Sequence, residues 1–307
     1  MRVARRKKIL IVRARTRYNL RRLSAILVVV IAASSAAPSS DAGTSSPIPA
    51  SPCGTTTSAT YTHVVWIMLE NVGYSVINSP SAPYLNGLAN ECGLATNYLA
   101  VSHPSLPNYI ALTSGSTQGI TDDGEPSVHP LRVPSIFSEL GDDWRTYAES
   151  MPSPCGKVTT NVYAARHNPA VYYTNISAKC EREDLALRLP LNLSAAFTMI
   201  VPNICDDMHS CAVSIGDAWL RKYVPLITKS QQYQSSSLVL FITFDENDSQ
   251  AVNRVPTLVV APSVPKGLKV NQSFTHYSLL RTTEELLHVS YLGLSKSTRS
   301  MTASFHL

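Results

Sequence analysis

Short apolar runs alternate with polar turns and helical stretches along most of the chain after about residue 61. Several runs are six or seven residues long and rich in β-branched or aromatic side chains, which predicts strands covered on both faces. The predicted strands are HVVWIML at 63–69, WRTYAE at 144–149, AFTMIV at 196–201, LVLFITF at 238–244 and TLVVAP at 257–262. The predicted helices are YLNGLANEC at 84–92, NYIALTSG at 108–115, AWLRKYVPLIT at 218–228 and SLLRTTEELL at 278–287. This alternation predicts an α/β fold with a mostly parallel central sheet.

The first 60 residues have a different composition. A basic region ends at Arg21 and Arg22 and is followed by eleven apolar residues, LSAILVVVIAA at 23–33, and then by small residues. This layout predicts a secretory signal peptide over residues 1–36, because the apolar stretch is shorter than the ~20 residues that span a bilayer. A leader that stays uncleaved and anchors the protein to a membrane is the alternative. Residues 37–60 are rich in Ser, Thr, Pro and Ala and are expected to form a flexible linker before a folded domain at 61–307.

The formal charge of +5 belongs to the leader. Ten of the 26 Lys and Arg residues lie between Arg2 and Arg22, and the rest of the chain carries 16 basic against 21 acidic residues, a net charge of −5. A body of this charge gives no argument for nucleic-acid binding. We expect a monomer that binds no nucleic acid.

All six cysteines follow the leader. An even number of cysteines in an exported chain indicates disulfides, although six cysteines allow 15 pairings. We expect the pairs Cys53 with Cys92, Cys155 with Cys180, and Cys205 with Cys211. A zinc site is the alternative, but the sequence has no CxxC pair.

Polar residues follow four of the predicted strands, at Glu70-Asn71, Glu149, Asp206-Asp207 with His209, and Asp245-Glu246. In open α/β sheets, ligands bind beyond the carboxyl ends of the strands. Adjacent carboxylates repel each other unless water or a cation shields them, and carboxylate and amide oxygens suit a divalent cation. A solvated turn is the alternative for FDENDSQ at 244–250.

The other candidate residues have structural alternatives. If Cys205 pairs with Cys211, the disulfide fixes the acids and the imidazole between them, although Asp206 or Asp207 could instead cap a helix. His167 taken alone is more typical of a hydrogen-bonded structural histidine.

Ser105 lies between Pro104 and Pro107, just before an apolar run. Its context, HPSLPNY, is not the GxSxG elbow of a triad esterase. The N-terminus of a helix offers backbone N–H groups and a positive dipole end, which favour an anion such as phosphate. A serine at that place, beside a metal held by carboxylates, could attack phosphorus; a simple helix cap is the alternative.

Seven motifs occur in a characteristic order over roughly residues 61–293: LENVGYSVI, HPSLPNYIALTSGSTQG, YAESMPSPC, RHNPAVYY, VPNICDDMH, FDEND followed by RVPTLVVAP, and HYSLLRTTEELL. In these motifs the chain resembles the phosphoesterase family, which contains secreted acid phosphatases and bacterial non-specific phospholipases C. It is most similar to the acid phosphatases, including those active on phosphatidylinositol 3-phosphate. The phospholipase branch typically has Thr at the position of Ser105 and Arg at that of Tyr109.

The resemblance implies an alkaline-phosphatase-like α/β/α sandwich and a divalent metal, with Mg, Ca, Mn, Fe and Zn all open. Ser105 would be the nucleophile, Asn108 and His167 would contact the phosphate, and His167 or His209 would protonate the leaving alcohol. The implied metal ligands are Glu70, Asn71, Ser105, Asp245 and Glu246, with a candidate second site at Asp207 and His209.

We therefore expect a secreted, metal-assisted acid phosphatase that hydrolyses phosphomonoesters through a phosphoserine intermediate. Phosphoinositides such as phosphatidylinositol 3-phosphate are candidate substrates, which would require a transient contact with a membrane surface. The alternatives are a phospholipase C, a metal-independent Ser-His-Asp carboxylesterase, and a surface binding module without activity.

Overall fold

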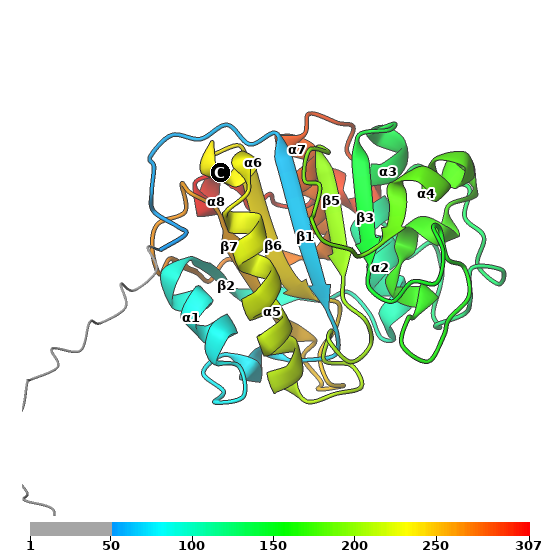
Figure 1. The fold of residues 1–307 in the computed structure, drawn as a ribbon, viewed down its shortest axis with the longest axis horizontal. Helices are drawn as coiled ribbons and strands as arrows, with labels where there is room; N and C mark the ends of the chain where they lie inside the picture. The colour runs from blue at the N-terminus through cyan, green and yellow to red at the C-terminus, as the bar shows by residue number, and fades with distance from the viewer. Residues whose placement is uncertain (1–50) are drawn as a thin grey trace, which may run out of the picture. The chain divides into compact units, whose positions relative to one another are not determined.

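The computed structural model describes residues 51–307; the predicted signal peptide and most of the predicted linker lie outside the described residues. A nine-stranded sheet runs through this part of the chain (Figure 1). Its strands are β1 (His63–Leu69), β2 (Gly93–Leu99), β3 (Trp144–Ala148), β4 (Asp184–Ala186), β5 (Phe197–Val201), β6 (Leu238–Phe244), β7 (Arg254–Val260), β8 (Lys269–Val270) and β9 (Phe274–Thr275).

The strand order is β4-β3-β5-β1-β6-β7-β2-β8, with β9 also paired to β2. Strands β4, β3, β5, β1 and β6 pair in parallel, whereas β7 is antiparallel to both β6 and β2. The prediction of a mostly parallel sheet is confirmed, and β7 is the reversed strand within the described chain. The five predicted strands all form, although β7 begins at Arg254, three residues earlier than expected.

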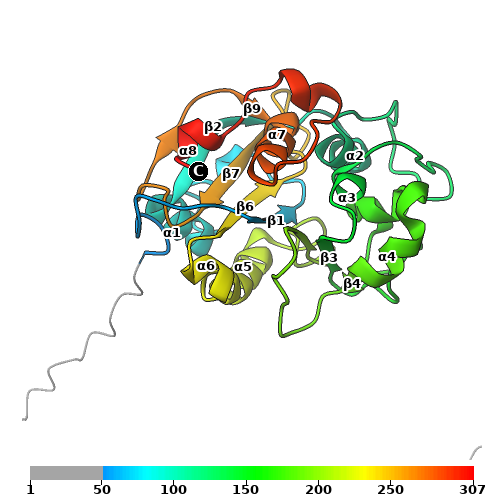
Figure 2. The ribbon, with the colours of Figure 1, turned by 90° about the horizontal axis from the view of Figure 1, so that it is seen from above.

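Helices cover both faces of the sheet, in three layers (Figure 2). Helices α1 (Pro83–Glu91), α5 (Val213–Thr228) and α6 (Gln231–Gln234) lie on one face, and α2 (Ser105–Ser114) and α7 (His276–Leu286) lie on the other. The shorter helices are α3 (Ile136–Glu139), α4 (Ser177–Glu183) and α8 (Thr302–Phe305). The 3-10 segments are η1 (Tyr74–Val76), η2 (Ala165–His167), η3 (Pro169–Tyr172), η4 (Thr174–Ile176) and η5 (Gly293–Ser297). This is the expected α/β/α sandwich. Within residues 51–307, none of the helices has both the length and the apolar character needed to cross a bilayer.

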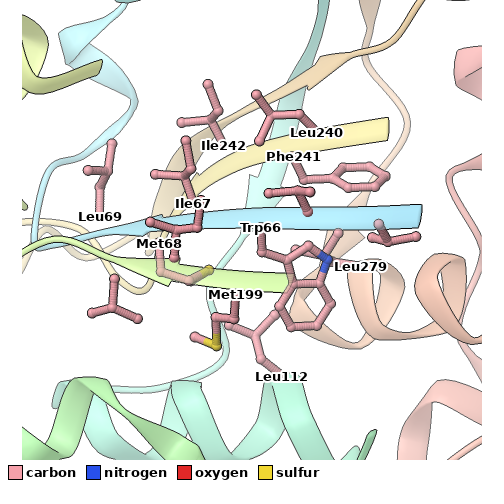
Figure 3. Close-up of a cluster of buried hydrophobic side chains, with 14 of the residues drawn as sticks. Trp66, Ile67, Met68, Leu69, Leu112, Met199, Leu240, Phe241, Ile242 and Leu279 are labelled. Carbon is pink, nitrogen blue, oxygen red and sulfur yellow. The ribbon is translucent and has the colours of Figure 1, made fainter. Parts of the chain in front are cut away.

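Strand β1 lies at the centre of the core. Its side chains alternate between the two faces of the sheet: Trp66 points towards Leu112 of α2 and Leu279 of α7, whereas Ile67 points to the opposite face (Figure 3). Strands β1 and β6 are buried almost completely, which explains why their apolar runs have no polar interruption. The indole Nε1–H of Trp66 donates to Thr283 Oγ1 at 3.1 Å, so its polar atom is also satisfied.

The three expected disulfides are present: Cys53–Cys92, Cys155–Cys180 and Cys205–Cys211. The Cys53–Cys92 disulfide changes the predicted end of the flexible linker. Residues 51–60 were expected to belong to the flexible linker, but Cys53 is buried, Thr55 N–H donates to Pro262 O, and the Tyr233 hydroxyl donates to Pro52 O. The end of the predicted linker is therefore attached to the domain, because a covalent bond and hydrogen bonds compensate for its lack of apolar surface.

Candidate active site

The carboxyl ends of β1, β5 and β6 meet the first turn of α2. Parallel strands place the residues that follow them at one edge of the sheet, so Glu70, Asp207 and Asp245 come together there although they are far apart in sequence. The side chains of these three acids are fully buried, and Ser105 is 2% exposed. The residues that follow the predicted strands thus form a compact buried cluster at the carboxyl edge of the sheet.

Glu70 is the centre of this cluster. The Ser105 hydroxyl donates to Glu70 Oε2 at 3.0 Å, and the Tyr109 hydroxyl donates to the other oxygen, Oε1. Ser105 and Tyr109 lie four residues apart on α2 and therefore on the same face of the helix. Tyr109 is a site residue that the sequence prediction did not assign, and this i, i+4 spacing after the serine was the signal for it.

Asp245 and Glu246 approach the serine from the other side. Ser105 Oγ lies 3.5 Å from Glu246 Oε1, and the Asn71 backbone N–H donates to Asp245 Oδ1 at 3.3 Å. The buried His276 donates through Nε2 to the backbone oxygen of Asp245 at 2.6 Å and so fixes the turn after β6. The predicted ligand set of Glu70, Asn71, Ser105, Asp245 and Glu246 is therefore brought together at one place.

His167 lies between two acids. Its Nε2 is 3.3 Å from Glu70 Oε2 and its Nδ1 is 3.2 Å from Asp207 Oδ2, and its ring stacks on Tyr109 with centroids 5.5 Å apart. Neither ring nitrogen makes a hydrogen bond with proper geometry. Ligand atoms of Glu70, His167 and Asp207 lie within 4.8 Å of one another, so these three side chains could together hold a metal ion.

His209 does not belong to that group. It is exposed at the edge of the loop closed by Cys205–Cys211, with Nε2 3.3 Å from Arg166 and Nδ1 3.0 Å from Ser210 Oγ. The sequence prediction paired His209 with Asp207 in a second metal site, and this stays a prediction. The His209 backbone N–H donates to Asp207 Oδ1 at 2.8 Å, and His167 Nδ1 lies 3.2 Å from Asp207 Oδ2. His209 is exposed, and Arg166 and Asp123 nearby are partly exposed as well.

The Asn108 side chain binds the backbone of the segment just before Ser105. Its Oδ1 accepts hydrogen bonds from the backbone N–H groups of Val101 and Ser102, and its Nδ2 donates to the backbone oxygens of Ser102 and Pro104. These four bonds use the polar atoms of the side chain to fold the segment before Ser105. In this structure Asn108 therefore orients the serine, and a direct contact with phosphate stays a prediction.

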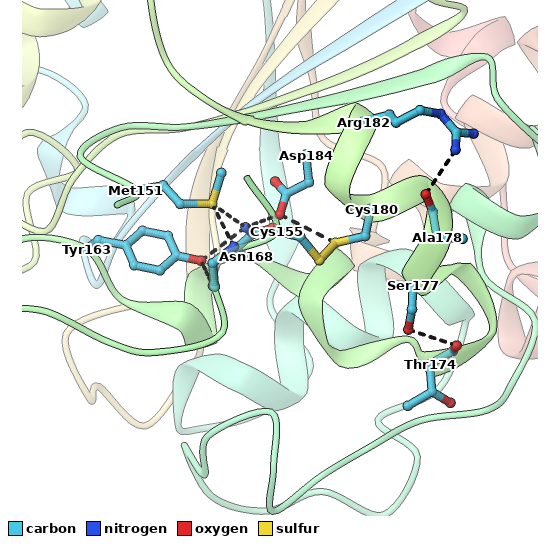
Figure 4. The surroundings of a disulfide bond; sticks show 11 residues. Met151, Cys155, Tyr163, Asn168, Thr174, Ser177, Ala178, Cys180, Arg182 and Asp184 are labelled. Carbon is cyan, nitrogen blue, oxygen red and sulfur yellow. Dashed lines mark hydrogen bonds between the residues drawn. A yellow bond between two sulfur atoms is a disulfide. The ribbon is translucent and has the colours of Figure 1, made fainter. Parts of the chain in front are cut away.

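Buried hydrogen bonds hold Asn168, the residue that follows His167 in the chain (Figure 4). The neighbouring Asn168 donates through Nδ2 to Asp184 Oδ2 at 2.8 Å and to the Tyr163 hydroxyl at 3.1 Å. Asp184 follows Cys180 by four residues, and its backbone oxygen accepts from Cys155 N–H at 2.9 Å. The Cys155–Cys180 disulfide thus fixes the segment that carries the histidine.

Burial dominates the electrostatics of the cluster. It raises the pKa of Glu70 well above the usual range, and the charges of Asp245 and Asp207 raise it further. Burial likewise raises the pKa of Asp245 well above normal and the pKa values of Asp207 and Glu246 to about 7. Burial, followed by the charge of Arg166, lowers the pKa of His167. A group of acids this crowded needs protons or a cation to stay buried.

The donor atoms fit a divalent cation. Asn71 Oδ1, Asp245 Oδ2 and Asp207 Oδ2 are hidden from solvent and have no hydrogen-bond partner within residues 51–307. Buried polar atoms are rarely left without partners unless something else binds them. Carboxylate and amide oxygens with an imidazole nitrogen form a donor set that Mg, Ca, Mn, Fe or Zn can accept, so the set fits a divalent metal without identifying it.

Comparisons with known proteins show which family the chain is similar to. The model of the Phosphoesterase family matches residues 74–290. The chain is 31% identical over 250 residues to a phosphatidylinositol-3-phosphatase of Mycobacterium tuberculosis, covering 79% of this chain and 82% of that protein. It is 31% identical to a phosphate-repressible acid phosphatase of Penicillium chrysogenum and 27% identical to an acid phosphatase of Aspergillus fumigatus, covering 78% and 80% of this chain. The alignments span 62% and 59% of these two fungal proteins, which are longer.

Solved structures share the fold at low sequence identity. A protein of the alkaline phosphatase superfamily from Vibrio parahaemolyticus matches with a TM-score of 0.55 at 11% identity, over 81% of this chain and 71% of that one. A lipoteichoic acid synthase from Listeria monocytogenes matches with a TM-score of 0.53 at 12% identity, over 76% and 74% of the two chains. The expected alkaline-phosphatase-like fold is confirmed.

Proposed function

We infer the reaction of this protein from its family: the chain belongs to the phosphoesterase family, and it is a phosphoester hydrolase. We propose that it cleaves phosphomonoesters with Ser105 as the nucleophile. One observation carries the proposal: Ser105 is the first residue of α2, and its hydroxyl donates to the buried carboxylate of Glu70. A hydroxyl held between buried acids and the positive end of a helix suits attack on a phosphoryl group.

Glu70, Asn71, Asp245 and Glu246 would hold a divalent metal beside Ser105, and Asp207 with His167 could complete a second position. When bound, such a cation lowers the pKa of a neighbouring hydroxyl and polarises a phosphoryl oxygen. The Ser105 hydroxyl passes its proton to Glu70, to which it donates. Ser105 Oγ forms a bond to phosphorus while the bond from phosphorus to the leaving alcohol breaks, which gives a phosphoserine. Water then attacks the phosphorus, releases inorganic phosphate and restores the serine.

The leaving alcohol needs a proton, and His209 is the better placed of the two histidines. His167 is buried between Glu70 and Asp207, whereas His209 is exposed to solvent beside the cluster. Burial lowers the pKa of His209, so its protonated form is most abundant under acidic conditions. An acid pH optimum follows from this assignment.

Substrate range and location are also part of the proposal. The relative from Mycobacterium tuberculosis is named for phosphatidylinositol 3-phosphate, which makes phosphoinositides candidate substrates at a membrane surface. Three disulfides and the layout of the leader support secretion of a monomeric domain.

The test compares Ser105→Ala with Ser114→Ala, a control at the other end of α2 whose hydroxyl donates to Ile110 O. We expect Ser105→Ala to lower kcat on p-nitrophenyl phosphate at least about 1,000-fold without loss of folding, and the control to keep its activity. Substantial activity in Ser105→Ala would refute the nucleophile.

A substrate panel separates the alternatives. It contains p-nitrophenyl phosphate, phosphatidylinositol 3-phosphate, phosphatidylcholine and p-nitrophenyl acetate, each with and without a chelator. Release of inorganic phosphate that stops on chelation supports the proposal. Diacylglycerol from phosphatidylcholine would identify a phospholipase C, acyl cleavage that survives chelation would identify a carboxylesterase, and no turnover would leave a binding module.

A further inference from the structure

A cation that the proposed mechanism does not use, Arg166, lies beside His209 and Asp123. Arg166 directly precedes His167 in η2 (Ala165–His167), and its side chain is 22% exposed. Its Nη2 lies 3.3 Å from His209 Nε2, but its Nε is hidden from solvent and has no hydrogen-bond partner within residues 51–307. A guanidinium has five N–H donors in a planar fork that matches carboxylate and phosphate oxygens. The Arg166 guanidinium therefore has an N–H donor available for a ligand.

A carboxylate links Arg166 to the start of α2. Asp123 Oδ1 accepts from the backbone N–H of Leu106 at 2.9 Å, and Asp123 Oδ2 lies 3.7 Å from Arg166 Nε. Leu106 is the residue after Ser105, so Asp123 uses an N–H of the first helical turn directly beside the proposed nucleophile. Helix N-termini of this kind bind anions, and here the anion is a side chain of the protein itself.

Arg166 and Asp123 both act on the buried cluster. Burial raises the pKa of Glu246 to about 7; the charge of Asp123 raises it and the charge of Arg166 lowers it. Arg166 also lowers the pKa of His209, while Asp123 raises it. Asp123 lies at the first turn of α2 and Arg166 lies beside Asp123, so both are next to the residues that would surround a bound phosphoryl group.

We propose that Arg166 and the Leu106 N–H bind the phosphoryl oxygens of the substrate, and that Asp123 occupies this anion site in the free enzyme. The inference rests on the proposed function, because it places the phosphoryl group at Ser105 Oγ. A phosphate monoester has several anionic oxygens and can accept from the guanidinium and the backbone N–H together.

Replacement of Asp123 by a phosphoryl group at this anion site requires little free energy. The 3.7 Å separation from Arg166 is longer than a hydrogen bond, and the Asp123 side chain is 36% exposed and can turn to water. Because a diester has one anionic oxygen fewer than a monoester, the same site favours monoesters. Arg166 is in this way a residue that sets substrate class.

The experiment uses inorganic phosphate as the probe, on the full domain loaded with the divalent ion that supports turnover. Phosphate affinity is measured by calorimetry and as a competitive inhibition constant against p-nitrophenyl phosphate. We expect Arg166→Ala to weaken phosphate binding about 10- to 100-fold, and Arg166→Lys to recover part of the loss. Asp123→Asn should tighten phosphate binding roughly two- to fivefold, because the competing charge is gone.

Asp122→Asn is the matched control. Asp122 is adjacent, but its carboxylate pairs with His129 Nε2 at 2.6 Å and does not contact α2, so its removal should leave phosphate affinity unchanged. Melting temperature and metal affinity are recorded for every variant. If Arg166→Ala loses metal affinity in parallel with phosphate affinity, its role is structural and the proposal is wrong.

The remaining outcomes separate the two proposals. Wild-type phosphate affinity in Arg166→Ala, with normal turnover in the wild type, would overturn the anion site and leave the phosphatase intact. Unchanged or weaker phosphate binding in Asp123→Asn would overturn the role of Asp123. A wild-type protein that neither binds phosphate nor hydrolyses a phosphomonoester would overturn both.

Discussion

Replacing Tyr109 by Phe removes one hydroxyl group from the centre of the site. The hydroxyl donates to Glu70 Oε1, and the ring stacks on His167 at an interplanar angle of 9°. Phenylalanine keeps the ring and its packing, so the change isolates the hydrogen bond. We expect the Tyr109→Phe protein to fold and to bind its divalent metal more weakly.

The magnitude follows from the surroundings of Glu70. Two hydroxyl donors, Tyr109 and Ser105, lower the pKa of this carboxyl against burial and the charges of Asp245 and Asp207. Loss of a hydrogen bond to a charged group costs about 1.5–3 kcal/mol, which corresponds to roughly 10- to 100-fold in affinity. Changes next to metal ligands have similar effects. Metal affinity should therefore fall about 10- to 100-fold.

The loss should also depend on pH. Without the Tyr109 donor the pKa of Glu70 rises further, so Glu70 stays protonated to a higher pH. A proton therefore competes with the metal ion for this carboxylate over a wider pH range. The affinity deficit of Tyr109→Phe should therefore be larger at pH 5 than at pH 8.

The assay is calorimetric titration of the chelator-treated protein with a divalent ion at both pH values. Tyr173→Phe is the control, because Tyr173 is also buried and shares a 2.7 Å hydrogen bond with Thr113 on the same helix, away from the cluster. An unchanged metal affinity in Tyr109→Phe, or an equal deficit at both pH values, would refute the reasoning.

Two further predictions concern stability. Burial raises the pKa of Asp184 from 3.8 to about 8, so the folded state holds this proton more tightly than the unfolded chain does. The resulting contribution to the free energy of unfolding is complete below about pH 4 and is lost as the pH rises through 8. It is worth at most roughly 6 kcal/mol. Asp184→Asn should flatten the pH dependence of the urea midpoint between pH 4 and pH 8, and an unchanged slope would show that Asp184 does not titrate in this range. Replacing both cysteines of a disulfide by Ala should destabilise the domain by about 4 kcal/mol for Cys53–Cys92, which are 39 residues apart, but by about 2 kcal/mol for Cys205–Cys211, which are six apart. Equal losses in denaturant titrations would mean that loop length does not control the effect.

The sequence was sufficient for the parts of the fold that depend on apolar runs. Strands β1, β5 and β6 are buried on both faces, so their continuous hydrophobic segments were visible without a structure. The residues directly after them were also visible, because a parallel sheet brings the ends of its strands to one edge. Glu70, Asn71, Asp245 and Glu246 were candidate metal ligands for this reason, whereas Ser105 joined the predicted set through the resemblance to the phosphoesterase family.

Other features have no local signature. Strand β2 (GLATNYL) contains polar residues and a break in its register with β7, and it was not predicted. β8 and β9 have two residues each, too few for a periodic pattern. The contact of Asp123 with Leu106 joins residues 17 apart through a loop, so only the folded chain reveals it. Asn108 was expected at the phosphate because its motif places it near the serine, but spacing alone does not say which atoms its amide meets.

The reversed direction of β7 has a consequence for how this scaffold can change. An antiparallel neighbour needs only a hairpin, whereas a parallel neighbour would need a crossover over one face of the sheet. The 245–253 hairpin therefore stays at the active edge, where the Asn253 side chain donates to Ser102 O at 2.7 Å and accepts from Asn247 N–H at 2.8 Å. Between Asn247 and Asn253, residues 248–252 are a suitable place for insertions: sequences inserted there would enlarge the loop at this edge of the sheet while leaving the strand order, the core and the buried acids as they are.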